Sequence, residues 1–129
     1  MIYEFDPTIY PRKIWITYDA TAEELNKKFP NSNCGKGFTD MDFNGVFYAV
    51  TYPVYESEHK VFGYLLRFPN KEGMSLFNIV HESVHVANRI FSVIGAEIDL
   101  ENDETYAYLV HWIVKCCDSI KEKHMLTDI

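Results

Sequence analysis

His81, Glu82 and His85 form an HExxH sequence, a spacing that suits metal chemistry. On an α-helix, residues four apart lie on one face, so both imidazoles can reach a single ion. The glutamate then projects beside the open side of that ion, where it can act as a base. Two imidazole ligands and one carboxylate predict a zinc site, with one zinc ion per chain.

The residues around this motif predict a helix over residues 76–91. Apolar residues recur there at helical spacing, namely Leu76, Ile79, Val80, Val84, Ala87 and Phe91. Such a helix belongs inside a domain, where two histidines and a carboxylate are costly to bury without a metal or dedicated partners. The alternative is a metal-free helical scaffold in which the motif arose by chance.

A second helix is expected after Gly95. The segment 95–105 is rich in carboxylates, and residues 106–115 then resume an apolar helical pattern. Asn102 or Asp103 suits the N-cap, because a short polar side chain there accepts from the first free backbone N–H groups. This carboxylate-rich helix start is where we look for a third zinc ligand.

Glu104 is the expected third ligand. It shares a helical stripe with Tyr108 and His111, so it points where the apolar face of that helix points. The other acids of the segment are read as solvated charges near a helix N-terminus. His111 and Asp99 remain the alternatives for the third position.

His81, Glu82 and His85, followed nineteen residues later by Glu104, resemble the gluzincin branch of zinc metallopeptidases, particularly its small single-domain members. The resemblance covers roughly residues 63–121. It implies that His81, His85 and Glu104 bind zinc and that Glu82 is the general base. It also implies a minimal zincin-like domain.

Two positions depart from the gluzincin pattern. Asp103 stands where many members have Asn, and Tyr108 stands where many have an Asp that orients a zinc-bound histidine. Larger members also supply a transition-state-stabilising His or Tyr from a further subdomain. Tyr108 and His111 are the expected catalytic substitutes, because either can donate a hydrogen bond to a developing oxyanion. The alternatives are core packing for Tyr108 and a solvated His111.

A zinc site with an adjacent glutamate predicts hydrolysis of peptide bonds. Zinc makes water a nucleophile near neutral pH, while Glu82 takes the proton and delivers it to the leaving amine. The expected partner is therefore a peptide or protein substrate. The alternative function is a catalytically inactive, zinc-stabilised protein-interaction module.

Composition narrows the class of protein. The 129 residues are 47% hydrophobic and 16% aromatic, which predicts a single folded domain over residues 1–129. A net charge of −7 argues against nucleic acid as a partner.

No segment has the length and hydropathy of a membrane span, and the N-terminus lacks a signal-peptide pattern, so a cytoplasmic protein is expected. The three cysteines lack CxxC spacing, and packing is their expected role.

The first half of the chain is expected to supply a sheet. Strands are predicted over residues 13–18, 45–52 and 60–68, with a capped helix over 21–29. The last two strands would form a hairpin through residues 55–59, in which His59 is read as solvated. The fold expected is α+β, with a small, mainly antiparallel sheet packed on the HExxH helix and a second C-terminal helix. Either hairpin strand could then bind extended peptide at a sheet edge.

Overall fold

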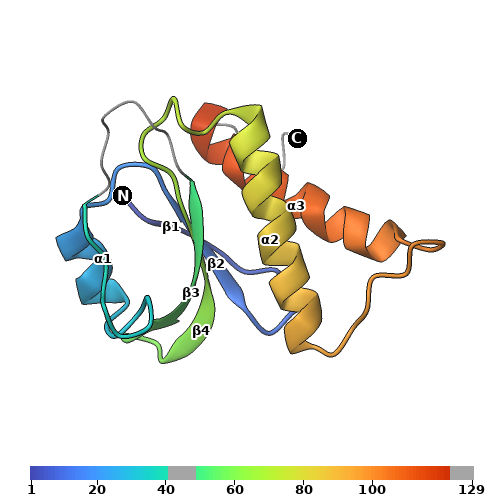
Figure 1. The fold of residues 1–129 in the computed structure, drawn as a ribbon, viewed down its shortest axis with the longest axis horizontal. Helices are drawn as coiled ribbons and strands as arrows, with labels where there is room; N and C mark the ends of the chain where they lie inside the picture. The colour runs from blue at the N-terminus through green and yellow to red at the C-terminus, as the bar shows by residue number, and fades with distance from the viewer. Residues whose placement is uncertain (41–48, 123–129) are drawn as a thin grey trace. The chain divides into compact units, whose positions relative to one another are not determined.

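The chain forms two compact units in the computed structural model, the first spanning Met1–Gly73 and the second beginning at Met74. Figure 1 shows a sheet with one helix in the first unit and a pair of helices in the second. The structure describes residues 1–40 and 49–122. The predicted α+β class is confirmed.

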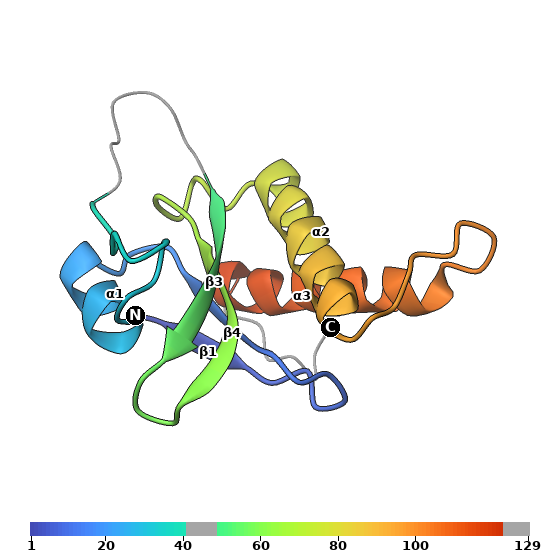
Figure 2. The same cartoon turned by 60° about the horizontal axis from the view of Figure 1, so that its bottom comes forward.

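A four-stranded sheet forms the first unit, with strand order β1-β2-β4-β3. Its strands are β1 (Tyr3–Phe5), β2 (Lys13–Thr17), β3 (Val50–Glu56) and β4 (Val61–Arg67). The pairs β1–β2 and β3–β4 are antiparallel, whereas β2 and β4 are parallel, so the sheet is mixed. The chain passes through a helix and β3 before it returns beside β2, which lets β4 run in the same direction as β2 (Figure 2). This mixed sheet is not the zincin fold that the resemblance implied.

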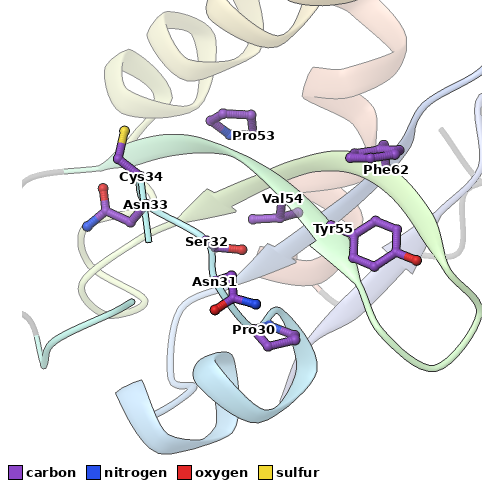
Figure 3. Close-up of a pocket in the computed structure, with 9 residues that line it drawn as sticks. All are labelled: Pro30, Asn31, Ser32, Asn33, Cys34, Pro53, Val54, Tyr55 and Phe62. Carbon is purple, nitrogen blue, oxygen red and sulfur yellow. The ribbon is translucent and has the colours of Figure 1, made fainter. Parts of the chain in front are cut away.

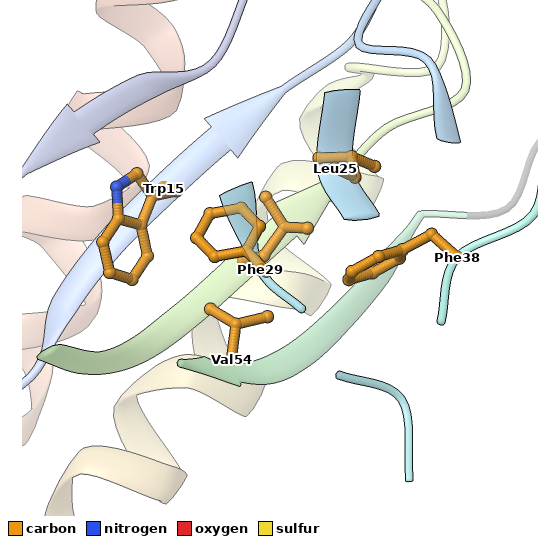
Figure 4. Close-up of a cluster of buried hydrophobic side chains, with 6 residues drawn as sticks. Trp15, Leu25, Phe29, Phe38 and Val54 are labelled. Atoms are coloured by element: carbon orange, nitrogen blue, oxygen red, sulfur yellow. The ribbon is translucent and has the colours of Figure 1, made fainter. Parts of the chain in front are cut away.

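Helix α1 (Ala22–Lys28) begins at a capping box, as predicted. The Thr21 side chain accepts from the Glu24 N–H, and the Glu24 side chain accepts from the Thr21 N–H, which satisfies donors that the helix leaves free. Leu25 and Phe29 then pack on one face of the sheet, in a buried cluster (Figure 4) of Trp15, Leu25, Phe29, Phe38, Val54 and Leu65. This cluster is the core of the first unit on its α1 side.

The strand predictions need three corrections. The first half of the strand predicted over residues 45–52 lies outside the described residues, and β3 runs on to Glu56, so the connecting turn is shorter than expected. β1 was not predicted, because three residues carry too short a pattern to identify a strand. β4 is a central strand and β3 an edge strand, so only β3 of the hairpin offers an open edge.

The second unit holds α2 (Leu76–Val93) and α3 (Glu104–Glu122). Both predicted helices are confirmed, although α3 extends seven residues beyond the predicted end at Lys115. The end of α2 contacts the start of α3, where the rings of Phe91 and Tyr106 have centroids 5.4 Å apart, and the two helices cross obliquely (Figure 2). Within the described part of the chain, neither helix is long and apolar enough to cross a membrane.

The cysteines divide by burial. Cys116 and Cys117 are buried in α3, as the packing role predicted, and burial raises the pKa of the Cys116 thiol to about 12. Cys34 is exposed, so the prediction that it packs is wrong. Its loop contains several residues with positive φ, Cys34 itself among them at +58°.

Candidate metal centre

Helix α2 places the HExxH residues. Ser75 is its N-cap, and the Ser75 side chain accepts from the Asn78 N–H at 3.2 Å, which satisfies one free donor of the first turn. The helix ends at Ile94, and Gly95 follows with a φ of +73°, a conformation that glycine adopts without a Cβ penalty. The motif therefore lies in the middle turns of the helix, where the backbone is most regular.

His81 and His85 lie together on one exposed face of α2. Their Nε2 atoms are 3.1 Å apart, and their rings meet edge to face with centroids 4.8 Å apart. At this distance one Nε2–H can donate to the other Nε2 when the rings are neutral. The helix thus brings two metal-ligating nitrogens to a single point.

The separation of the two nitrogens fits a zinc ion. Zinc–nitrogen bonds of about 2.0–2.1 Å at a tetrahedral angle place two ligand atoms about 3.3 Å apart. The observed 3.1 Å between the Nε2 atoms of His81 and His85 is close to that value. Both rings can therefore bind one ion with little movement of their side chains.

Glu82 lies beside these nitrogens but is buried. Its side chain is 7% exposed, against 69% for His81, because the next residue on a helix is rotated by about 100°. Glu82 Oε2 is nevertheless 3.8 Å from His81 Nε2, and the ligand atoms of His81, Glu82 and His85 all lie within 4.8 Å of one another. The carboxylate can thus serve as a base or as an oxygen ligand at this point.

Glu104 is the first residue of α3 and is exposed. It does not belong to the close group of His81, Glu82 and His85, so its role as third ligand stays a prediction. Its helix is nevertheless tied to α2, because Tyr106 Oη donates to Asn88 Oδ1 at 2.5 Å. Asn88 lies on α2 one turn after His85, so the start of α3 lies near the C-terminal end of the HExxH motif.

The two predicted oxyanion donors stack on each other. The Tyr108 ring, 66% exposed, lies parallel to the His111 imidazole with centroids 6.5 Å apart. The alternative that Tyr108 packs in a core is therefore wrong. His111 also lines a hollow of about 370 Å³ beside Leu76 and Ile79, in the first turn of α2. Within the described residues His111 is not part of the close group of His81, Glu82 and His85, so its role as an oxyanion donor stays a prediction.

Asp99, the alternative third ligand, lies in the loop between the two helices. Its Oδ1 accepts from the Glu101 N–H at 3.0 Å, and its carbonyl accepts from the Asn102 N–H at 3.1 Å. These bonds fold the loop into a turn just before α3. Asp99 thus has a local structural role, and it too lies outside the close group around His81.

A second group of metal-ligating side chains lies in the first unit. Glu56 ends β3, and Glu58 and His59 follow in the turn, with their ligand atoms within 4.8 Å of one another. His59 was predicted to be solvated, and its side chain is 60% exposed. Glu56 was not predicted as a candidate ligand, because its burial at a strand end depends on the pairing of β3 with β4.

The chain matches no family model, no curated protein and no solved structure.

Proposed function

We propose that the protein is a zinc-dependent hydrolase that cleaves peptide bonds, with His81 and His85 as zinc ligands. The observation that carries this proposal is the 3.1 Å separation of the two Nε2 atoms on an exposed helix face. Imidazole nitrogens at that spacing suit zinc, and the exposed face leaves room for a substrate. One zinc ion per chain is proposed.

Glu82 is the proposed general base. Its carboxylate lies 3.8 Å from His81 Nε2, so it is near enough to take a proton from water at the same point and pass it to the leaving amine. A bound zinc ion would supply Lewis acidity and make water a nucleophile near neutral pH. The burial of Glu82 holds the carboxylate in place and limits its contact with bulk solvent.

Glu104 is the proposed third ligand, because it begins a helix that hydrogen-bonds to α2 one turn beyond His85. Ligation by Glu104 would draw the first turn of α3 toward the two histidines. Tyr108 and His111 lie on the same helix and are the proposed oxyanion donors, with Tyr108 nearer to the helix start.

A second candidate function is a zinc-stabilised interaction module without catalysis. The observation that favours it is the 7% exposure of the Glu82 side chain, since a general base must contact the water that attacks the substrate. In this case zinc would fix the helix pair, and the exposed face of α2 would contact a protein partner.

Zinc content of purified protein tests the metal site. Wild type should retain about one zinc per chain after dialysis, and His81→Ala/His85→Ala should retain much less, because ligand loss weakens zinc binding at least about tenfold. Glu104→Ala should also lose zinc, whereas the matched control Glu101→Ala should keep it. Wild type that binds no zinc even when it is offered would overturn the proposal.

Peptide hydrolysis by Glu82→Gln separates the two candidate functions. If Glu82 is the base, this variant should bind zinc like wild type but lose at least about a hundredfold in rate, the usual effect of general-base catalysis. A zinc-loaded wild type without hydrolysis of any peptide in a mixed library, together with an unchanged Glu82→Gln variant, would favour the interaction module.

A further inference from the structure

Glu56, at the end of β3, is a fully buried carboxylate in a short turn. Its Oε2 accepts from the His59 N–H at 2.8 Å, whereas its Oε1 is buried and accepts no hydrogen bond. Buried carboxylate oxygens normally have such a partner, because losing water without one is costly. Oε1 therefore faces a place where a cation or donor would be stabilised.

Two groups of the same region face Glu56 Oε1 without donating to it. His59 Nδ1 lies 3.4 Å away, and Lys28 Nζ lies 3.7 Å away. The Glu58 carboxylate completes the group, with its ligand oxygen within 4.8 Å of those of Glu56 and His59. Two carboxylates and one imidazole thus converge within one turn of four residues.

The turn is fixed in place by its contacts with α1. The Ser57 N–H donates to the Lys28 carbonyl at 3.2 Å, at the C-terminal end of that helix. Lys60 closes the turn with a φ of +58°. The three side chains therefore start from a turn that one hydrogen bond ties to the end of α1 and that the pairing of Glu56 with Val61 closes.

We propose that Glu56, Glu58 and His59 bind a divalent transition-metal ion of the zinc class. The 3.4 Å between Glu56 Oε1 and His59 Nδ1 matches the separation of about 3.3 Å between two ligands of a tetrahedral ion. One imidazole and two carboxylates are ligands that zinc accepts. This site is separate from the HExxH site and does not depend on the proposed function.

Lys28 competes with the ion for Glu56. Among the described lysine and arginine residues, only Lys28 has its charged nitrogen within 4.0 Å of the Glu56 carboxylate. The Lys28 side chain is 28% exposed, so it can turn toward solvent when an ion takes its place. Removing Lys28 should therefore strengthen metal binding, whereas removing a ligand should weaken it.

Zinc chloride titrated into full-length His81→Ala/His85→Ala protein isolates this site. Binding is followed by isothermal titration and by NMR shifts of the His59 ring and of the amides of residues 56–60. One zinc should bind per chain with shifts confined to this turn. Affinity should fall at least about tenfold in His59→Ala and in Glu56→Gln, and rise several-fold in Lys28→Met.

The opposing outcomes are distinct. No zinc binding in the double-histidine variant, or binding whose shifts lie away from residues 56–60, would overturn the proposal. Equal zinc affinity with and without Lys28→Met in the double-histidine variant would also overturn it, because the ion would then not bind Glu56 in place of Lys28. Since His59 is mostly exposed, His59→Ala should fold even where Glu56→Gln does not.

Discussion

Two glutamates proposed as metal ligands, Glu104 and Glu56, differ in burial. Glu104 is exposed at the start of α3, whereas Glu56 has no exposed surface. Burial acts to raise the pKa of Glu56, but the His59 N–H and the charges of Lys28 and His59 outweigh it, so the pKa lies below its ordinary value of 4.5. The ionised form of Glu56 is therefore stabilised by folding.

This lowered pKa predicts how stability depends on pH. A carboxyl with a folded pKa below its unfolded value stabilises the protein above pH 4.5, and this contribution is lost as the pH falls through the folded value. In the presence of chelator, Glu56→Gln should lower the free energy of unfolding by about 1–2 kcal/mol at pH 7. Urea unfolding should show that the difference shrinks as the pH is lowered from 7 to 3, because below pH 4.5 the unfolded chain binds the proton more tightly than the folded chain.

The matched control is Glu58→Gln, because Glu58 is exposed. Its unfolding free energy should differ from that of wild type by less than about 0.5 kcal/mol at both pH values. A Glu56→Gln deficit that stays constant from pH 7 to pH 3 would mean that the charge of Glu56 does not stabilise the fold.

The parallel strands β2 and β4 approach each other closely at Gly63. Gly63 pairs with Lys13, and a Cβ added at Gly63 would lie 2.2 Å from the Lys13 carbonyl oxygen and 2.5 Å from the Trp15 ring. A backbone carbonyl cannot move aside for an added methyl group as the end of a flexible side chain can. The parallel pair therefore requires glycine at this position for close approach, although its φ is not in the left-handed region.

Gly63→Ala should lower the free energy of unfolding by about 3 kcal/mol or more, since the strands must separate to admit the methyl group. Gly35→Ala is the control, because its Cβ meets nothing within 4 Å and costs only about 1–2 kcal/mol through its positive φ. Equal losses in urea unfolding of the two variants would contradict the proposed role of Gly63.

The edge of the sheet also bears on peptide binding. β3 is an edge strand, but Pro53 in its middle lacks the N–H that an added strand would need. Edge prolines commonly prevent such pairing. The expected capture of extended peptide along β3 is therefore limited to the strand segments on either side of Pro53.

At the scale of the whole molecule, the two units contain different metal-ligating groups. The first holds Glu56, Glu58 and His59, and the second holds His81, Glu82 and His85. A net charge of −7 attracts any cation, so binding of zinc at a specific site must be distinguished from general attraction of cations. Stability measured at defined metal concentrations distinguishes the two.

Metal bound only to the folded state should raise the melting temperature. Zinc at about one hundred times its dissociation constant adds about 2.7 kcal/mol, which corresponds to a rise of roughly 5–10 °C for a chain of this size. Wild type in zinc should therefore melt higher than wild type in chelator by calorimetry. His81→Ala/His85→Ala should lose the part of the rise that the HExxH site supplies and keep the part that the Glu56 site supplies, while an equal rise with magnesium would indicate diffuse attraction.

Local patterns in the sequence determined the helices and the pairing of His81 with His85. A capping box, an apolar helical stripe and a four-residue spacing are local features, so α1, α2 and the convergence of two imidazoles could be predicted without the fold. The start of α3 was likewise predicted to within two residues, from its carboxylate-rich entry.

Only the tertiary structure decided the features that depend on residues distant in the chain. The parallel pairing of β2 with β4 requires a crossover that no local pattern specifies, and the burial of Glu56 follows from strand pairing and from contact with α1. The position of Glu104 relative to His81 and His85 depends on the conformation of the loop between α2 and α3, and the length of that loop does not determine its conformation. Side-chain chemistry could therefore be read from sequence, whereas the distances between side chains on different elements could not.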